Sequence, residues 1–250
     1  MEAIEHPPIL QLPGIPDHVT YTWLVMLILL GLAFLATRSI QLVPRGVQNA
    51  MEVVIEQVLG LLDDVVGHEG RRYLPLIATL GLFILTANLM GLVPGMVTPT
   101  GNLNTTAACA LIVFFTYHWI GIRRHGLLGY ARHFAGPVPW LAPLMVPIEF
   151  FSHLARPLSL SVRLFGNMTG GHILLAVIFF LLGLDGLIGW VGSGSLWGVL
   201  IGAPASLMMV LFTVGFLFPL KMLVALLQAF IFVMLSMVYI AGAVEEAEHH

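Results

Sequence analysis

The chain has 250 residues, of which 58% are hydrophobic and only 9% are Asp, Glu, Lys or Arg. Soluble domains carry about 25% charged residues, so 10 basic and 13 acidic side chains cannot cover a water-facing surface of this size. Apolar stretches of about 20 residues recur, and each is long enough to cross the hydrocarbon layer of a bilayer. The composition excludes a soluble enzyme, a nucleic-acid-binding protein and a disordered chain, and indicates a polytopic membrane protein.

The apolar stretches predict helices, because they are continuously apolar whereas membrane strands alternate between apolar and polar residues. We expect an all-α polytopic membrane protein with about five membrane helices and an interfacial amphipathic helix. The single cysteine, Cys109, lies inside an apolar stretch, which argues against a disulfide framework and against a multi-cysteine metal site. We expect neither a metal nor a cofactor.

The first half of the chain predicts an external tail, three spans and the amphipathic helix. Residues 1–20 are polar and proline-rich and form the expected tail. In residues 43–66, hydrophobic side chains recur every three or four positions, which is typical of a helix lying at the membrane interface or on a partner. The spans are expected at residues 21–37, 74–93 and 104–122.

The last 110 residues contain two longer apolar segments, at 144–184 and 196–243, separated by a glycine-rich loop. A continuous helix of about 40 residues is roughly 60 Å long, twice the thickness of the hydrocarbon layer. It fits only if it is tilted or if it breaks, for example at Pro157, Pro204 or Pro219. We favour a steeply tilted helical hairpin within a single membrane domain over residues 21–250.

The basic residues predict the orientation of the chain, because cytoplasmic loops are enriched in Lys and Arg. With the N-terminus outside and the C-terminus in the cytoplasm, the external segments 1–20, 94–103 and 185–195 contain no Lys or Arg. The basic residues then expected on the cytoplasmic side are Arg38, Arg45, Arg71, Arg72, Arg123, Arg124 and Arg132.

Arg163 lies within an apolar segment, where a charged side chain costs about 2.5–3.5 kcal/mol on insertion scales. A snorkelling arginine near a helix end is one interpretation. However, Ser159 and Asn167 each lie about 40° from Arg163 on a helix, and Gly170 and Glu149 fall on the same stripe. A stripe of small and polar groups with a permanent cation favours close approach of another helix.

Other polar residues extend this pattern into neighbouring segments. Lys221, Gln228 and Tyr239 share one face of the last helix. Gln228, like Asn88 in the second span, is either a hydrogen-bonding contact between helices or a functional ligand. His172 lies opposite Arg163 on its helix, so it belongs either to a separate polar path or to the structural core.

A permanent cation inside hydrocarbon can act on a carboxylic acid that moves past it. Hydrocarbon favours the neutral acid, whereas a nearby cation stabilises the carboxylate and so makes the acid release its proton. The cation also blocks direct proton leakage between two water paths. This chain contains no lone mid-membrane carboxylate suited to such a shuttle, so the acid would have to come from a partner.

Three segments of the chain resemble subunit a of the F-type ATP synthases. They are SLSVRLFGNM at 159–168, LQAFIF at 227–232 and NLMGLVP at 88–94. The resemblance implies a non-catalytic, proton-conducting stator subunit of a bacterial inner membrane. Its partners would be the c-subunit ring, the b subunits of the peripheral stalk, protons and membrane lipid, with no nucleic acid.

The resemblance also implies residue roles. Arg163 would face the essential carboxylate of each c subunit where two aqueous half-channels meet, and proton flow would turn the ring. Lys221 departs from the family pattern, because relatives often carry His or Glu there, and we expect no relay role for it. The helix at 43–66 would contact the peripheral stalk. The expected proton pathway comprises Asn167, Gln228, His172, Glu149, Ser159 and Asn88.

Two alternatives come from other functional classes. A secondary transporter would use Arg163 to bind an anionic substrate, but the inverted repeats expected of such a protein are not found. A haem-bearing membrane anchor would need paired histidines on two spans, and the histidines of this chain do not form such helical pairs. These histidines are His118, His125, His133 and His153.

Overall fold

The computed structural model describes residues 9–10, 12–93, 95–133, 142–181, 190–192, 195–196 and 198–245. Within these ranges the chain forms helices, turns and loops and no strand, which confirms the all-α prediction. Four helical segments are long and apolar enough to cross a membrane: 17–37, 68–90, 103–124 and 199–244. The predicted external segment 185–195 lies largely outside the described residues, as do residues 1–8 and 11 of the predicted N-terminal tail.

The helices α1 (Asp17–Thr37) and α3 (Leu74–Met90) match the first two predicted spans. The helix α4 (Leu103–His133) contains the third predicted span, 104–122, because its apolar part of membrane length covers residues 103–124. Beyond this part, α4 is not straight. The change of direction comes at Gly126, whose φ of 70° is readily adopted by glycine.

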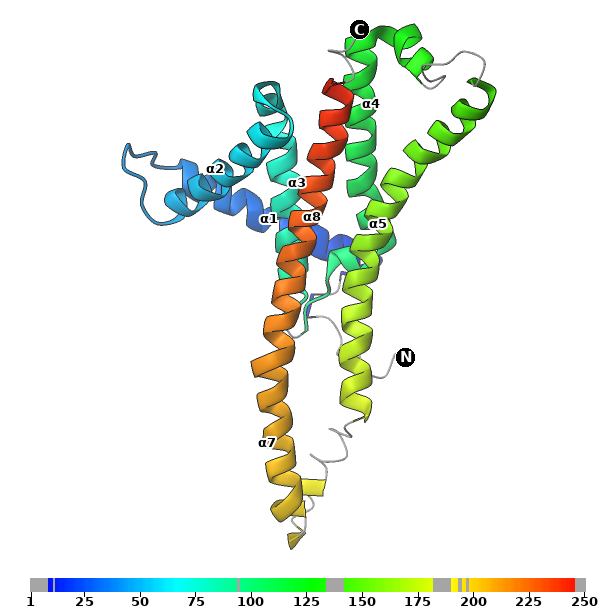
Figure 1. The fold of residues 1–250 in the computed structure, drawn as a ribbon. Coiled ribbons are helices and arrows are strands. Elements are labelled where there is room, and N and C mark those ends of the chain that lie inside the picture. The colour runs from blue at the N-terminus through cyan, green and yellow to red at the C-terminus, as the bar shows by residue number, and fades with distance from the viewer. Residues whose placement is uncertain are drawn as a thin grey trace.

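The helix α2 (Val47–Val65) forms the predicted amphipathic element and projects sideways from the other helices (Figure 1). Its second half packs against the core: Leu62 is fully buried, and Val58, Leu61 and Val65 pack beside it. In the first half Val54 remains exposed. A short helix, η1 (His68–Tyr73), then leads into α3.

The two long segments form the predicted pair of extended helices. The helix α5 (Ala142–Leu181) is 40 residues long and runs through Pro147 and Pro157 without ending. Its length is therefore about 60 Å. In Figure 1, α5 lies beside α8 (Phe218–Glu245) along part of its course and diverges from it toward the end where the chain terminates.

The second arm of this pair is a series of joined helical segments rather than one regular helix. A π-helical turn, η4 (Gly198–Gly202), leads into α7 (Ala203–Phe212), and a second, η5 (Thr213–Leu217), leads into α8. Pro204 and Pro219 both lie in the first turn of an α-helix, where a missing N–H costs nothing. These prolines therefore do not break the arm.

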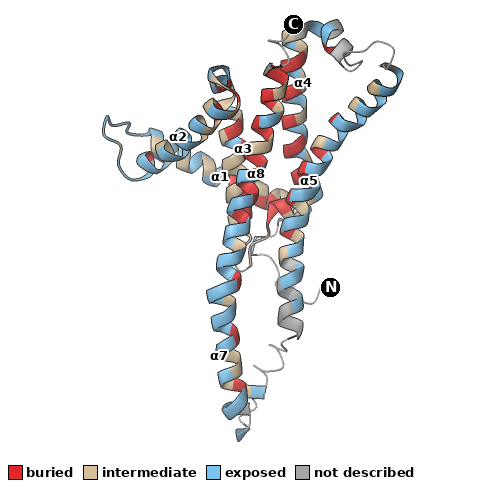
Figure 2. Ribbon diagram, in the orientation of Figure 1, coloured by how far each residue is buried: buried red, intermediate tan, exposed pale blue. Residues whose placement is uncertain are grey.

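The core is built around α8, which packs against α3, α4 and α5. The side chains of Phe232, Met237 and Ile240 in α8 are fully buried. A methyl group added at Gly81 of α3 would lie 2.7 Å from Cγ2 of Val233, so α3 approaches α8 closely. Figure 2 shows that buried residues gather where α3, α4, α5 and α8 meet.

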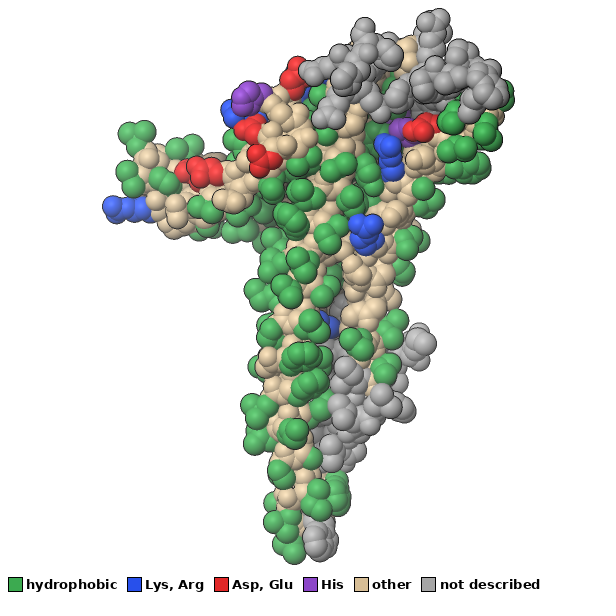
Figure 3. Space-filling model, in the orientation of Figure 1, with side chains coloured by type: hydrophobic (Ala, Val, Ile, Leu, Met, Phe, Trp, Pro, Cys, Tyr) green, Lys and Arg blue, Asp and Glu red, His purple; other side chains and the backbone are tan. Residues whose placement is uncertain are grey.

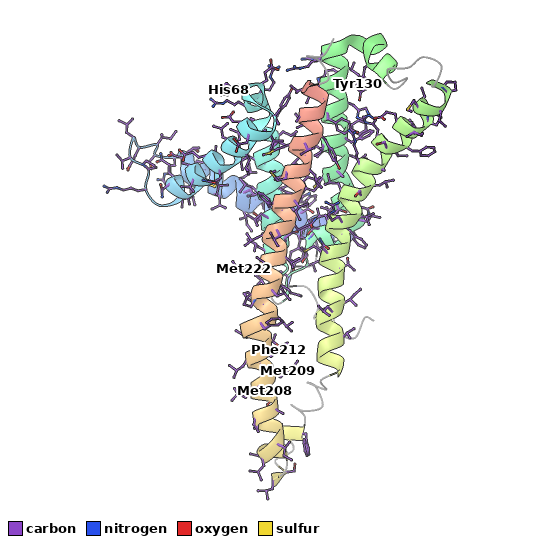
Figure 4. The ribbon with its side chains drawn as sticks, in the orientation of Figure 1. His68, Tyr130, Met208, Met209, Phe212 and Met222 are labelled. Atoms are coloured by element: carbon purple, nitrogen blue, oxygen red, sulfur yellow. The ribbon has the colours of Figure 1, made fainter. Side chains whose placement is uncertain are left out.

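Few of the described side chains of α7, at the end of the long helical pair away from the C-terminus, are buried (Figure 2). Met208 and Phe212 of α7, labelled in Figure 4, are exposed apolar side chains. In a protein of this composition, such a surface is suited to lipid or to an apolar partner.

Candidate functional site

Arg163 lies on α5 and its side chain is exposed. Ser159 and Asn167, one turn before and after it, are exposed as well. Leu160 and Leu164, at the edge of this stripe, are buried between α5 and its neighbours. The structure therefore places the predicted polar stripe on the outward face of α5. No carboxylate in the described part of the chain forms an ion pair with Arg163.

A hydrogen bond links this stripe to the last helix. Asn167 donates from Nδ2 to Oε1 of Gln228 at 2.6 Å. Gln228 is almost completely buried, and its Nε2 has no hydrogen-bond partner among the described residues. A buried donor without a partner costs about 1–3 kcal/mol. Gln228 therefore holds a buried amide donor without a partner among the described residues, in contact with Asn167, one helical turn from Arg163.

Asn88 is buried and forms hydrogen bonds that join several elements of the fold. Its Oδ1 accepts a hydrogen bond from Oγ1 of Thr100 at 2.7 Å, and its Nδ2 donates to the carbonyl of Ala225 at 3.3 Å. Asn88 and Thr100 are both buried. Asn88 thus ties α3 to α8 and to the loop helix η2 (Pro99–Gly101).

A cavity of about 100 Å³ lies between α3, α5 and α8. Its lining is mainly apolar, with polar groups from Asn88, Thr98, Asn167 and Lys221. Lys221 approaches α5 so closely that a Cβ on Gly171 would lie 3.9 Å from its Cε. The space is sufficient for several water molecules. The side chain of His172 lies outside the described part of the chain.

A second cluster of polar side chains lies nearer the start of α5, so Arg163 separates it from the cavity along the helix axis. Glu149 Oε1 is 3.3 Å from Nε2 of His153, and Nδ1 of His153 is 3.1 Å from the hydroxyl of Tyr117. His153 and Tyr117 are buried. The rings of His118 and His153 have centroids 5.2 Å apart.

Sequence reasoning predicted Glu149 but missed its neighbours. The spacing of four residues between Glu149 and His153 was the available signal, because residues i and i+4 share a helix face. No local signal indicated Tyr117, which comes from α4 and meets His153 only through helix packing.

Comparison with known proteins gives a consistent match over nearly the whole chain. Residues 19–241 match the family model described as ATP synthase A chain. The chain is 49% identical over 247 residues to ATP synthase subunit a 1 of Syntrophotalea carbinolica, which covers 99% of this chain and 91% of the relative. It is 47% identical over 231 residues to ATP synthase subunit a of Geobacter sulfurreducens, which covers 92% of this chain and 89% of the relative. The family match includes every helix that positions Arg163, Asn167 and Gln228.

Proposed function

The chain belongs to the ATP synthase subunit a family, and on this premise we propose that it is the proton-conducting stator of the membrane sector. In this proposal Arg163 faces the carboxylates of a c-subunit ring where two aqueous half-channels meet. Proton flow through them drives the ring past the stator. The chain itself is non-catalytic: it moves protons and forms no covalent intermediate.

The observation that carries the proposal is the exposed cation on α5. Arg163 has no carboxylate partner among the described residues, and its neighbours on the same face are small or polar. A passing carboxylic acid would lose its proton near this guanidinium, because the cation stabilises the carboxylate. Each proton that crosses the membrane then releases about 2.3 kcal/mol per 100 mV.

The positions of the polar groups along α5 support two offset water paths. Glu149 precedes Arg163 by 14 residues, or about 21 Å of helix, whereas Gly171 at the cavity follows it by eight residues, or about 12 Å. In our proposal the cavity beside Asn167 and Lys221 belongs to the external path and Glu149 to the cytoplasmic path. Arg163 separates the two.

The distribution of charge supports the proposed orientation. Figure 3 shows charged side chains gathered mainly around α2 and the end of the molecule at which α8 terminates, while the other end is largely apolar on this face. Assigning the charged end to the cytoplasm places the N-terminus outside and the C-terminus inside, in a bacterial inner membrane. The exposed half of α2 would then lie where b subunits of a peripheral stalk could dock. The transporter alternative has no structural observation in its favour.

ATP-driven proton pumping by inverted membrane vesicles tests the proposal. We expect Arg163→Ala in the complete ATP synthase to abolish pumping, because the ring carboxylates would no longer be discharged. Arg163→Lys should be severely impaired, since an ammonium does not replace a planar guanidinium. Arg38→Ala, which removes an exposed arginine outside the site, is the matched control and should pump normally. Near-normal pumping by Arg163→Ala vesicles contradicts the proposal.

A further inference from the structure

His153 lies in a buried position where both of its ring nitrogens have partners. Nε2 lies 3.3 Å from the carboxylate of Glu149, which precedes it by one turn of α5. Nδ1 lies 3.1 Å from the hydroxyl of Tyr117 on α4. The side chain of Glu149 is 35% exposed and that of His153 only 10% exposed. The imidazole thus connects a carboxylate that reaches the surface to a phenol in the core.

Tyr117 can satisfy His153 in more than one protonation state. When Nδ1 is unprotonated, the Tyr117 hydroxyl donates to it. When Nδ1 carries a proton, it donates to the Tyr117 oxygen, and the hydroxyl can turn to the carbonyl oxygen of His153, 3.5 Å away. A buried imidazolium at this position therefore leaves neither ring N–H unpaired, which removes the main cost of burying it.

The charges around His153 act in opposite directions. Glu149 favours the imidazolium, whereas Arg156 on α5 opposes it, with its guanidinium carbon 5.8 Å from the ring centre of Tyr117 and 5.4 Å from that of Tyr239 on α8. His118 on α4 stacks close by, and its Nδ1 lies 2.9 Å from the carbonyl oxygen of Phe114. A carbonyl only accepts, so Nδ1 of His118 carries a hydrogen.

The remaining titratable group at this cluster is a second tyrosine of α4. Tyr130, labelled in Figure 4, meets the ring of His118 edge-on with 5.8 Å between centroids. Helices α4, α5 and α8 all contribute to the cluster, and its only carboxylate among the described residues is that of Glu149.

We propose that His153 is a proton-holding residue of the cytoplasmic path, which exchanges one proton with Glu149. The neutral acid of Glu149 transfers its proton to Nε2 while Nδ1–H is held by Tyr117, giving an imidazolium and a carboxylate. The carboxylate takes the next proton from water, and the reverse transfer returns the stored proton to Glu149. The pair therefore holds one more proton than Glu149 alone near neutral pH. This inference rests on the proposed function of the chain.

The test measures passive proton conduction of the membrane sector. Inverted vesicles carrying the complete assembly are stripped of the catalytic headpiece, and a potassium diffusion potential drives protons in from the cytoplasmic face. The conductance is recorded from about pH 5 to about pH 8.5, a range that spans the ordinary titrations of Glu and His.

We expect His153→Gln to lower conductance about a hundredfold near neutral pH, which is the lower end of the range for proton transfer by a positioned side chain. The loss should shrink as the pH falls, because protons from water become abundant enough to reach Glu149 without the proton stored on His153. Tyr117→Phe should show a smaller loss of the same form, because it leaves the Nδ1–H of the imidazolium unpaired. A purely structural role would instead lower conductance equally at every pH.

His118→Gln is the matched control, because it changes the neighbouring imidazole and leaves the contacts of His153 with Glu149 and Tyr117 in place. It should retain the wild-type pH profile. An unchanged profile in His153→Gln, a uniform loss at all pH values, or a loss confined to His118→Gln overturns the assignment. Wild-type vesicles that conduct no faster than vesicles lacking this chain would instead refute the proposed function itself.

Discussion

The hydrogen bond from Asn167 to Gln228 joins α5 to α8 one helical turn from Arg163. Asn167 is exposed, whereas Gln228 is buried and depends on this contact for its Oε1. Interhelical hydrogen bonds in membranes contribute about 0.6–2 kcal/mol. The pair therefore both fixes the position of the stripe and supplies polar atoms to it.

This pair gives a prediction for stability. Asn167→Leu should lower the free energy of unfolding by about 1 kcal/mol, and adding Gln228→Leu should recover part of that loss, because no buried amide is then left without a partner. Thermal unfolding of the detergent-solubilised chain measures the losses. Ser159→Ala, on the same exposed face, is the control and should unfold as the wild type does. A double variant less stable than Asn167→Leu would show that the two side chains are not coupled.

Single residues were predictable where one position was chemically conspicuous. An arginine within an apolar segment made Arg163 a candidate site residue without any structure, since burial of a guanidinium is costly. His153 was not predictable in the same way, because its partner Tyr117 is 36 residues away along the chain. The dual contact of Asn88 with Thr100 and Ala225 likewise depends on how helices meet.

At the scale of elements, the joint between α2 and η1 is held by an ion pair. Arg71 donates from Nε and Nη2 to the two oxygens of Asp63, at 2.9 and 2.7 Å. These hydrogen bonds and the charge of Arg71 hold the pKa of Asp63 below its ordinary value of 3.8. Nearby, Glu69 of η1 pairs with Arg124, which connects η1 to α4.

The sign of this pKa shift fixes a pH dependence. A carboxylate whose pKa is lowered on folding stabilises the fold above the unfolded pKa, and this contribution disappears as the pH falls through the folded pKa. We expect Asp63→Asn to lower the thermal midpoint slightly at neutral pH, with the difference from wild type shrinking below about pH 4 and disappearing as the pH falls through the lowered pKa of Asp63. Asp64→Asn, at the exposed neighbouring carboxylate, should have no such effect at either pH. A difference that persists in acid would exclude the ion pair as its cause.

The sequence predicted where the helices lie along the chain better than it predicted their kinks and their packing. The apolar stretches correctly located α1, α3, α5 and the membrane-length part of α4 at 103–124, whereas the kink of α4 at Gly126 was not predicted. In α5, Pro157 is accommodated inside the helix, although proline removes one backbone hydrogen bond. The burial of Leu62 and the exposure of Val54 on α2 depend on the neighbouring helices and not on the periodicity of α2 itself.

At the scale of the whole molecule, the polar stripe on α5 faces outward beside an apolar surface formed by α5, α7 and α8. Exposed apolar side chains on this pair include Leu158 and Val162 of α5 and Phe230 of α8. A cation directed into lipid alone would be costly, whereas a partner helix that brings a carboxylate would stabilise it. Composition and charge predicted the membrane class and orientation, but they could not show which face of α5 remains uncovered.

Disulfide crosslinking to the c-ring tests most directly whether this face meets a rotor. Cysteines introduced at Ser159 or Asn167 of α5, in the assembled complex with Cys109 replaced, are paired with cysteines beside the essential carboxylate of the ring helix. Our account predicts crosslinks from these two exposed positions and none from Leu160 or Leu164, whose side chains are buried against neighbouring helices. Crosslinks formed only from the buried positions, or from no position on α5, would contradict it.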